Sequence, residues 1–160
     1  MSSFGSFTRF LPDEAATVAA GAKIGRALNT GCVVFLVGEL GAGKTTFTRG
    51  ALRALGHAGS VKSPTYTRCE PYDLADEAQL CHLDLYRLSN PEELEFLGIR
   101  DYVASGAILF IEWPSKGEGW LPAPDLQVAL QATDTGRQLE ISALTADGQD
   151  LLSRMGDGHA

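Results

Sequence analysis

Residues 38–45 read GELGAGKT, and this octet fits the phosphate-binding loop pattern G-x-x-x-x-G-K-[ST] in full. An apolar run at residues 32–37 precedes it and a helical pattern follows it, which is the strand–loop–helix order that such a loop requires. Glycines allow consecutive backbone N–H groups to turn inward around an anion, and the start of the helix adds its positive end. The octet therefore constrains the chain to an α/β fold that holds the phosphates of a nucleotide at the end of a strand.

The loop pattern also assigns roles to single residues. We expect Lys44 to reach the β- and γ-phosphates of a nucleoside triphosphate, and the Thr45 hydroxyl to ligate Mg²⁺. A glycine-rich turn with a stray lysine is the alternative, but a complete match by chance in a chain of this length has odds on the order of one in a hundred. The residues expected to contact the nucleotide here are Gly38, Glu39, Leu40, Gly41, Ala42, Gly43, Lys44, Thr45 and Thr46.

Size and charge limit what else the chain can be. With 160 residues, 44% of them apolar, it is long enough for one domain with a proper core but too short for a second substrate domain. The formal net charge of −7 argues against a protein that holds nucleic acid by itself, because that role needs a clustered basic face. No apolar run approaches the roughly 20 residues of a membrane span, and residues 1–10 lack a secretory signal pattern. We therefore expect a cytoplasmic protein without membrane contact.

The cysteines carry no recognisable motif. Cys32, Cys69 and Cys81 have neither metal-ligand nor redox spacing, and their odd number argues against a disulfide framework. We interpret them as buried or idle thiols in a reducing compartment.

Hydrophobic periodicity and helix-start signals predict alternating strands and helices. Gly21 and Gly25 lower helix propensity, and would be tolerated if their helix packs closely against the sheet. Gly98 could break the third predicted helix. Strands are expected at residues 6–11, 32–37, 65–72, 79–86, 107–111, 126–133 and 138–144, and helices at about 14–29, 46–55 and 90–103.

These elements predict a P-loop NTPase-type α/β fold. Its central sheet is expected to be mixed and mostly parallel, with helices on its faces and a C-terminal β-hairpin around residues 134–136. We expect the domain to span residues 1–146, and the polar residues 147–160 to form a disordered tail.

Two acidic residues at predicted strand ends are candidates for the chemistry. Asp84 lies with His82 and Tyr86 on the polar face of its strand, because leucines alternate with polar residues there. Glu112 ends the fully apolar run 107–111, at the position where phosphate-loop enzymes usually carry their second metal-side acid. We therefore assign the metal to Glu112, and to Asp84 either a role behind the direct metal ligands or the orientation of a water molecule. A solvated strand-end carboxylate is the alternative for each, and His82 is interpreted as a strand-face histidine.

A threonine and an aromatic residue near the loop have weaker signals. Thr65, in Ser63-Pro64-Thr65-Tyr66, follows the loop helix at the distance of a nucleotide-sensing switch segment, although Ser-Pro-Thr is also a common turn. Trp113 could stack on a base, but packing is the simpler interpretation.

Five separated blocks together resemble the TsaE family, small bacterial P-loop ATPases formerly known as YjeE. The resemblance covers roughly residues 4–145, and the blocks stand in the family's order. They are GELGAGKTT (38–46), VKSPTYT (61–67), HLDLYRL (82–88), NPEELEFLGIRDY (90–102) and FIEWPSKGEGWLP (110–122).

This resemblance implies a weak Mg²⁺-dependent ATPase needed for threonylcarbamoyladenosine (t6A) formation in tRNA. Such proteins work with TsaD, the transferase, and TsaB, its inactive paralogue, so tRNA would be met through that complex. It further implies that Lys44, Thr45 and Glu112 hold phosphate and metal, that Asp84 supports hydrolysis, and that Thr65 belongs to the switch segment. The positions similar to the family's remaining nucleotide contacts are Glu14 and Arg137.

Two other functions fit the same loop. A small-molecule kinase generally needs a lid with several arginines, and residues 115–124 offer only Lys116. A nucleotide-gated binding module would bind ATP without hydrolysing it, using the nucleotide only to order the segment around Thr65.

Overall fold

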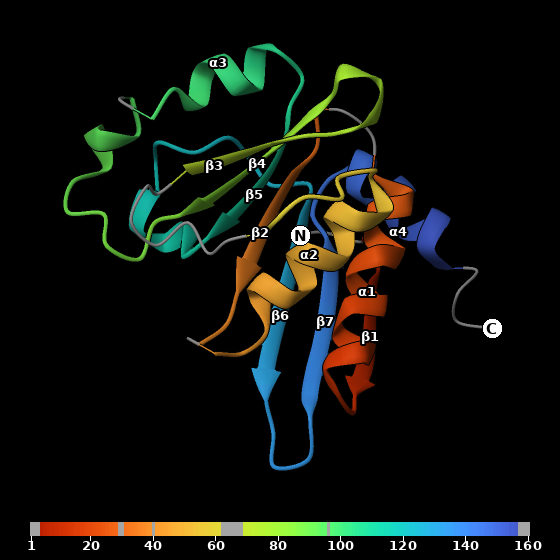
Figure 1. Ribbon diagram of the computed structural model, residues 1–160. Helices are drawn as coiled ribbons and strands as arrows, with labels where there is room; N and C mark the ends of the chain where they lie inside the picture. Colours follow the sequence, from red (N-terminus) through yellow and green to blue (C-terminus); the bar gives the residue numbers. More distant parts are fainter. Residues whose placement is uncertain (1–3, 29–30, 40, 62–68, 96, 157–160) are drawn as a thin grey trace.

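The computed structural model of the chain describes residues 4–28, 31–39, 41–61, 69–95 and 97–156 (Figure 1). Within these residues, one sheet has seven strands in the spatial order first, seventh, sixth, second, fifth, fourth, third. The strands are β1 (Ser6–Leu11), β2 (Val33–Val37), β3 (Cys69–Asp73), β4 (Gln79–Asp84), β5 (Ile108–Glu112), β6 (Leu126–Ala132) and β7 (Arg137–Ala143).

The centre of this sheet is parallel and its margins are antiparallel. Strands β6, β2, β5 and β4 run in one direction, whereas β7 and β3 run against their neighbours. Strand β1 pairs antiparallel with β7 and so points the same way as the central strands. The predicted P-loop NTPase-type fold, with a mostly parallel sheet and a hairpin formed by β6 and β7, is confirmed.

Helices cover one face of the hairpin half of the sheet. Helices α1 (Glu14–Ala27) and α2 (Lys44–Ala54) lie side by side there (Figure 1). Their backbones approach so closely that a Cβ on Gly21 would stand 2.0 Å from the Phe47 carbonyl oxygen, and one on Gly50 2.1 Å from that of Val18. The glycines of α1 are therefore explained by packing against α2, rather than against the sheet as predicted.

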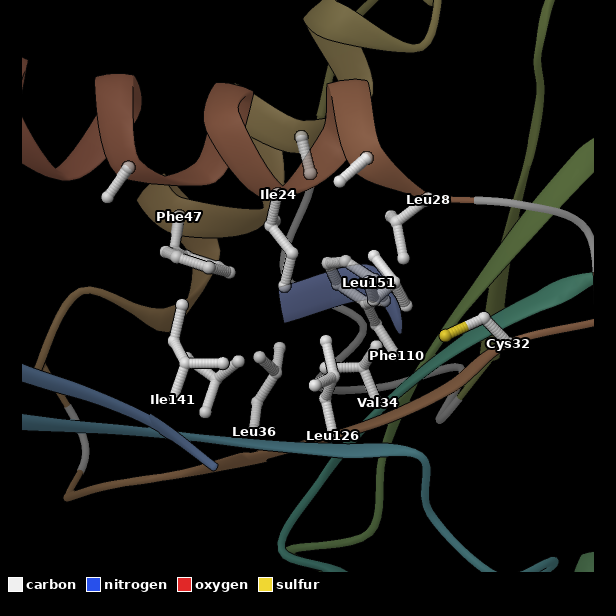
Figure 2. Close-up of a cluster of buried hydrophobic side chains, with 14 of the residues drawn as sticks. Ile24, Leu28, Cys32, Val34, Leu36, Phe47, Phe110, Leu126, Ile141 and Leu151 are labelled. Carbon is white, nitrogen blue, oxygen red and sulfur yellow. The ribbon is translucent and has the colours of Figure 1, made fainter. Parts of the chain in front are cut away.

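The sheet separates two clusters of buried side chains. On the face of α1 and α2, Ile24 and Phe47 meet Leu36, Phe110 and other strand residues (Figure 2). On the opposite face, side chains of β4 and β5 pack against the segment that follows β4. The strands contribute Cys81, Leu83, Leu109 and Ile111, and the segment contributes Leu85, Leu94 and Ile99. Strand β5 is buried along its whole length, as expected of a central parallel strand covered on both faces.

The helix expected over residues 90–103 is interrupted. A 3₁₀ helix at Pro91–Glu95 and helix α3 (Ile99–Ala104) replace it, and Gly98 between them has a positive φ of 74°. The predicted start near residue 90 is confirmed: Asn90 Oδ1 accepts from the Glu92 N–H at 2.9 Å, and Glu93 Oε2 accepts from the Asn90 N–H at 3.0 Å.

The disordered tail expected from residue 147 is wrong for the described part of it. Residues Ala146–Gly156 form helix α4, which buries Leu151 and Met155 against the cluster of Figure 2. Arg154 donates two hydrogen bonds, at 2.8 and 3.1 Å, to the Ala27 carbonyl at the end of α1. The apolar positions 151, 152 and 155 share one helical face, a pattern that the surrounding polar residues conceal. Among the described residues, none of the helices is long and apolar enough to cross a bilayer.

Candidate nucleotide site

The glycines of the loop between β2 and α2 have backbone conformations that a phosphate-binding loop requires. Gly38, Gly41 and Gly43 have φ values of 154°, 81° and 107°, which residues with a Cβ rarely adopt. A Cβ on Gly38 would also stand 2.4 Å from the Leu130 carbonyl oxygen of β6. Helix α2 begins at Lys44, so its free N–H groups open directly from the loop. The glycine spacing of the octet is therefore explained by backbone conformation and by close approach to β6.

Lys44 lies folded back across this loop. Its side chain is 5% exposed, and Nζ donates to the Gly38 carbonyl at 2.5 Å and lies 3.5 Å from Glu112 Oε1. The same ammonium group is 4.6 Å from the centre of the Trp113 ring, within cation–π range. Among the described residues the cation thus has three partners, which lie at the carboxyl ends of β2 and β5.

The two candidate acids meet at this edge of the sheet. Asp84 and Glu112 are direct partners in the parallel pair of β4 and β5, and are 6% and 4% exposed. Glu112 Oε2 lies 2.6 Å from His82 Nε2, while Asp84 Oδ1 accepts from the Tyr86 N–H at 2.9 Å. One carboxylate is therefore held between two basic side chains, and the other by a backbone amide.

Burial changes the acidity of Asp84. Desolvation raises the pKa of its carboxyl above 3.8, against the Tyr86 N–H, which stabilises the carboxylate. The charge of the neighbouring Glu112 raises the pKa further, and the charges of His82 and Lys44 lower it. Asp84 is thus more easily protonated than an ordinary aspartate.

A cavity of about 430 Å³ opens over these groups. Eight of its lining residues are among those predicted to bind the nucleotide or carry the chemistry, and they come from the loop, α2, β4, β5 and β7. The remaining two, Tyr86 and Arg87, are additions. The lining comprises Gly41, Gly43, Lys44, Thr45, Thr46, Asp84, Tyr86, Arg87, Glu112 and Arg137.

Arg137 reaches the cavity from the first residue of β7. Its Nη2 donates to the Gly41 carbonyl at 3.4 Å, and its Nη1 to the Gly136 carbonyl at 3.2 Å. The guanidinium group therefore lies beside the loop, on the side opposite the acids' strands in the sheet order.

Other predicted residues lie elsewhere. Glu14, at the start of α1, has a 70% exposed side chain that pairs with Arg49 at 3.1 Å, and it does not line this cavity in the described part of the chain. Gly38 and Glu39 line a neighbouring cavity of about 540 Å³, and Ala42 is buried. Leu40 and Thr65, with the whole segment 62–68, fall outside the described residues.

Sequence reasoning undervalued His82 and missed Arg87, whereas its interpretation of Trp113 is supported. His82 is fully buried and bound to Glu112, and its Nδ1 has no hydrogen-bond partner among the described residues. The Tyr86 and Trp113 rings lie 4.9 Å apart, so the predicted packing role of Trp113 is supported. Arg87, the last polar residue of HLDLYR, follows Asp84 by three positions, and that proximity was the available signal.

The oxygen donors at the cavity suit a hard cation. The Thr45 hydroxyl and the carboxylates of Asp84 and Glu112 are ligand types that Mg²⁺ prefers, and Mg²⁺ usually takes one or two protein ligands beside substrate phosphates. In the described residues, no group of three or more His, Cys, Asp and Glu side chains is arranged to hold a metal ion without such help.

Comparison with known proteins identifies the class and then the family. The strand–loop–helix unit and the parallel central strands define a P-loop NTPase-type fold, and the crystal structure of Bacillus subtilis YdiB matches the whole chain and is itself matched in full, with a TM-score of 0.79 at 27% identity. The family model described as "Threonylcarbamoyl adenosine biosynthesis protein TsaE" matches residues 11–139. The chain belongs to the TsaE family.

Curated relatives agree along nearly the full length. The chain is 46% identical over 153 residues to the tRNA threonylcarbamoyladenosine biosynthesis protein TsaE of Haemophilus influenzae, covering 92% of this chain and 96% of that protein. It is 36% identical over 150 residues to the protein of the same name from a Nostoc species, covering 90% of each. The resemblance seen in the five sequence blocks is confirmed.

Proposed function

We propose that this chain binds ATP with Mg²⁺ in the cavity over the phosphate loop and hydrolyses it slowly in support of tRNA threonylcarbamoyladenosine formation. One observation carries the proposal: the loop's backbone amides, the Lys44 ammonium, the Thr45 hydroxyl and two carboxylates converge on one cavity. Family membership supplies the pathway, since the relatives are named for t6A biosynthesis.

Lys44 would exchange its present partners for phosphate oxygens. A buried ammonium that holds the Gly38 carbonyl and Glu112 is already desolvated, and Lys44 lines the cavity. The charged oxygens of a phosphate would compete for it with charge-assisted hydrogen bonds of their own. When Lys44 turns to the nucleotide, Glu112 Oε1 would be released to face the cavity.

The two acids would then divide the remaining work. Thr45 and Glu112 are the residues that would hold Mg²⁺, which supplies charge neutralisation for the triphosphate when bound. Asp84, held at one oxygen by the Tyr86 N–H, keeps its other oxygen for orienting the attacking water. We also propose Arg137 and Glu14 as contacts for the rest of the nucleotide. Arg137 already lines the cavity, whereas Glu14 would have to leave its ion pair with Arg49.

Partner proteins would turn slow hydrolysis into a cycle. We propose, from the family, that the ATP-bound chain docks on TsaB–TsaD, that the switch segment containing Thr65 senses the triphosphate, and that hydrolysis resets the transferase between turnovers. Contact with tRNA would come through that complex in the cytoplasm, which agrees with a net charge of −7 on this chain.

Calorimetry and phosphate release test the ATPase proposal. We expect Mg²⁺-dependent ATP binding, and slow phosphate release that TsaB–TsaD accelerate. A reconstituted tRNA modification assay should stop after one turnover with Lys44→Ala and continue with Lys116→Ala, an exposed lysine outside the cavity. Multiple turnovers with Lys44→Ala would refute the coupling to hydrolysis, and transfer of labelled phosphate to a small acceptor would indicate a kinase instead.

A further inference from the structure

Two cysteines that are 12 positions apart in the sequence lie against each other at the margin of the sheet. Cys69 begins the edge strand β3, and Cys81 lies in its neighbour β4, with their Sγ atoms 2.7 Å apart. Cys69 stands opposite Leu83 and Cys81 opposite Pro71, so the pair is diagonal in the antiparallel ladder. Diagonal side chains are usually farther apart than directly opposite ones, but these two sulfurs are within about 0.7 Å of the length of a disulfide bond.

The surroundings of the two thiols are unequal. Cys81 is fully buried, whereas Cys69 is half-buried at the sheet edge. Hydrogen bonds from Cys81 and from the Tyr102 hydroxyl of α3 lower the pKa of Cys69. The hydrogen bond to Cys69 and burial raise the pKa of Cys81. Cys69 is therefore the thiol that a reagent in solution can contact and that becomes the thiolate, whereas Cys81 reacts after Cys69 has been modified.

The third cysteine provides an internal reference. Cys32 is buried in the cluster on the other face of the sheet, where burial and Asp125 raise its pKa to about 12. It has neither the neighbouring thiol nor the partial exposure of Cys69, so it should stay unreactive in the folded chain.

We propose that Cys69 and Cys81 form a thiol–disulfide modification site for low-molecular-weight disulfides. The Cys69 thiolate attacks one sulfur of the disulfide RSSR, forming a mixed disulfide and releasing RS⁻, which takes up the proton of Cys81. The Cys81 sulfur then attacks Cys69 Sγ, and the second RS⁻ leaves and is protonated by water. The protein loses two thiols, and two molecules of RSH are formed.

The bond would fasten a strand at the margin of the sheet. In the described part of the chain β3 pairs only with β4, and Pro71 in its middle is a residue that sheets tolerate at edges. A covalent link from the first residue of β3 to β4 would hold the end of the strand that directly follows residues 62–68. The idle-thiol interpretation made from spacing alone therefore does not extend to this pair, because strand pairing, not sequence spacing, brings the sulfurs together.

Hydroxyethyl disulfide, a small symmetrical reagent, tests the proposal without any nucleotide. After treatment of the folded chain, alkylation and mass spectrometry, we expect loss of two of the three thiols, a Cys69–Cys81 linked peptide, and full recovery with dithiothreitol. Cys32→Ser should behave in the same way, with no thiol left after treatment. Cys81→Ser should stop at one mercaptoethanol adduct on Cys69, and Cys69→Ser should leave both remaining thiols unmodified.

Other outcomes would overturn the proposal. A stable adduct on Cys69 of the unsubstituted chain would show that Cys81 does not resolve it. Equal modification of Cys32 and Cys69 would show that the pair has no special reactivity, and rapid modification of Cys81 in Cys69→Ser would show that burial does not protect it. Circular dichroism of each variant before treatment separates these results from unfolding.

Discussion

Strands β4 and β5 end side by side at the phosphate loop, each with a carboxylate, and the two ends are built differently. Glu112, at the end of β5, lies between His82 Nε2 at 2.6 Å and Lys44 Nζ at 3.5 Å. Asp84, its direct partner at the end of β4, accepts from the backbone N–H of Tyr86. Both are almost fully buried, so exposure does not distinguish them.

The difference lies in what each neighbour can do for a negative charge. At Glu112, two basic side chains fix the direction of the carboxylate oxygens, whereas at Asp84 desolvation raises the pKa of the carboxyl in spite of the single Tyr86 N–H. A carboxylate with fixed oxygens suits metal binding, and a carboxyl group with a raised pKa suits proton transfer from water. Position at the sheet edge thus selects both acids, and their partners separate the proposed roles.

Removing the cation shared by the loop and Glu112 should have the largest effect. Lys44→Ala should weaken ATP binding by roughly 100-fold or more, since a hydrogen bond to a charged group contributes about 1.5–3 kcal/mol and more than one is lost. Calorimetry measures the change, with Lys116→Ala as the exposed-lysine control. If the Lys44→Ala protein bound ATP within a few-fold of the unsubstituted chain, the Lys44 ammonium would not be a phosphate contact.

Exchanging one Glu112 oxygen for an amide tests the metal side of the comparison. Glu112→Gln keeps the shape of the side chain, but an amide is a poor Mg²⁺ ligand, so we expect the Mg²⁺-dependent part of ATP affinity to fall by roughly 10- to 100-fold. Titrations with Mg²⁺ and with EDTA separate that part from the rest. Glu118→Gln, at an exposed position beyond the site, should change nothing. A loss of equal size with and without Mg²⁺ would mean that Glu112 acts on the nucleotide directly.

The matching change at Asp84 should spare binding and slow the chemistry. Asp84→Asn retains the acceptor for the Tyr86 N–H but cannot orient or deprotonate water as a carboxylate does, so we expect hydrolysis to fall by roughly 100-fold with ATP affinity within a few-fold. Single-turnover phosphate release measures the rate independently of product release. If Asp84→Asn lost the Mg²⁺-dependent affinity and Glu112→Gln only the rate, the two roles would have to be exchanged.

The raised pKa of Asp84 also predicts a smaller effect of the same substitution, on the stability of the folded chain. It is measured without nucleotide and in the presence of EDTA. Because folding raises this pKa above 3.8, the folded chain binds the proton more tightly than the unfolded chain. The contribution of this proton to the free energy of unfolding is therefore fully present below pH 3.8, and it is lost as the pH rises through the pKa of Asp84 in the folded chain. Asp84→Asn should therefore raise the unfolding midpoint at pH 7, and the gain should shrink toward pH 3.8. Asp134→Asn, in the exposed hairpin turn, is the control, and a lower midpoint for Asp84→Asn at pH 7 would contradict the sign.

Local patterns account for what could be predicted. The glycine spacing of the octet predicted the backbone of its glycines, and alternation or continuous apolarity placed Asp84 and Glu112 at strand ends. The structure adds that these two strands are direct neighbours. Helix α4 was missed because its apolar face is short and its burial depends on β7 and α1.

Tertiary contacts account for the rest. The His82–Glu112 contact joins residues 30 positions apart, and no spacing in the sequence announces it. Glu14 pairs with Arg49 across two helices, at a distance set by the close approach of Gly21 and Gly50 to the opposite backbones. Arg87 lies beyond the end of β4, where alternation no longer states which way a side chain faces.

The smallest expected effect is on the far side of the loop from both acids. Arg137 contacts the Gly41 carbonyl at 3.4 Å from β7, so its guanidinium group would supplement the loop's grip on the nucleotide without touching either carboxylate. Arg137→Ala should weaken ATP binding by roughly three- to tenfold, in line with about 1 kcal/mol for a partly exposed contact, and should do so equally with Mg²⁺ and with EDTA. Arg100→Ala, which removes an 82% exposed arginine paired with Glu95, is the matched control. If affinity for ATP fell only in the presence of Mg²⁺, Arg137 would act on the metal-bound phosphates. Strand β7 would then contribute to the metal side of the site together with β5.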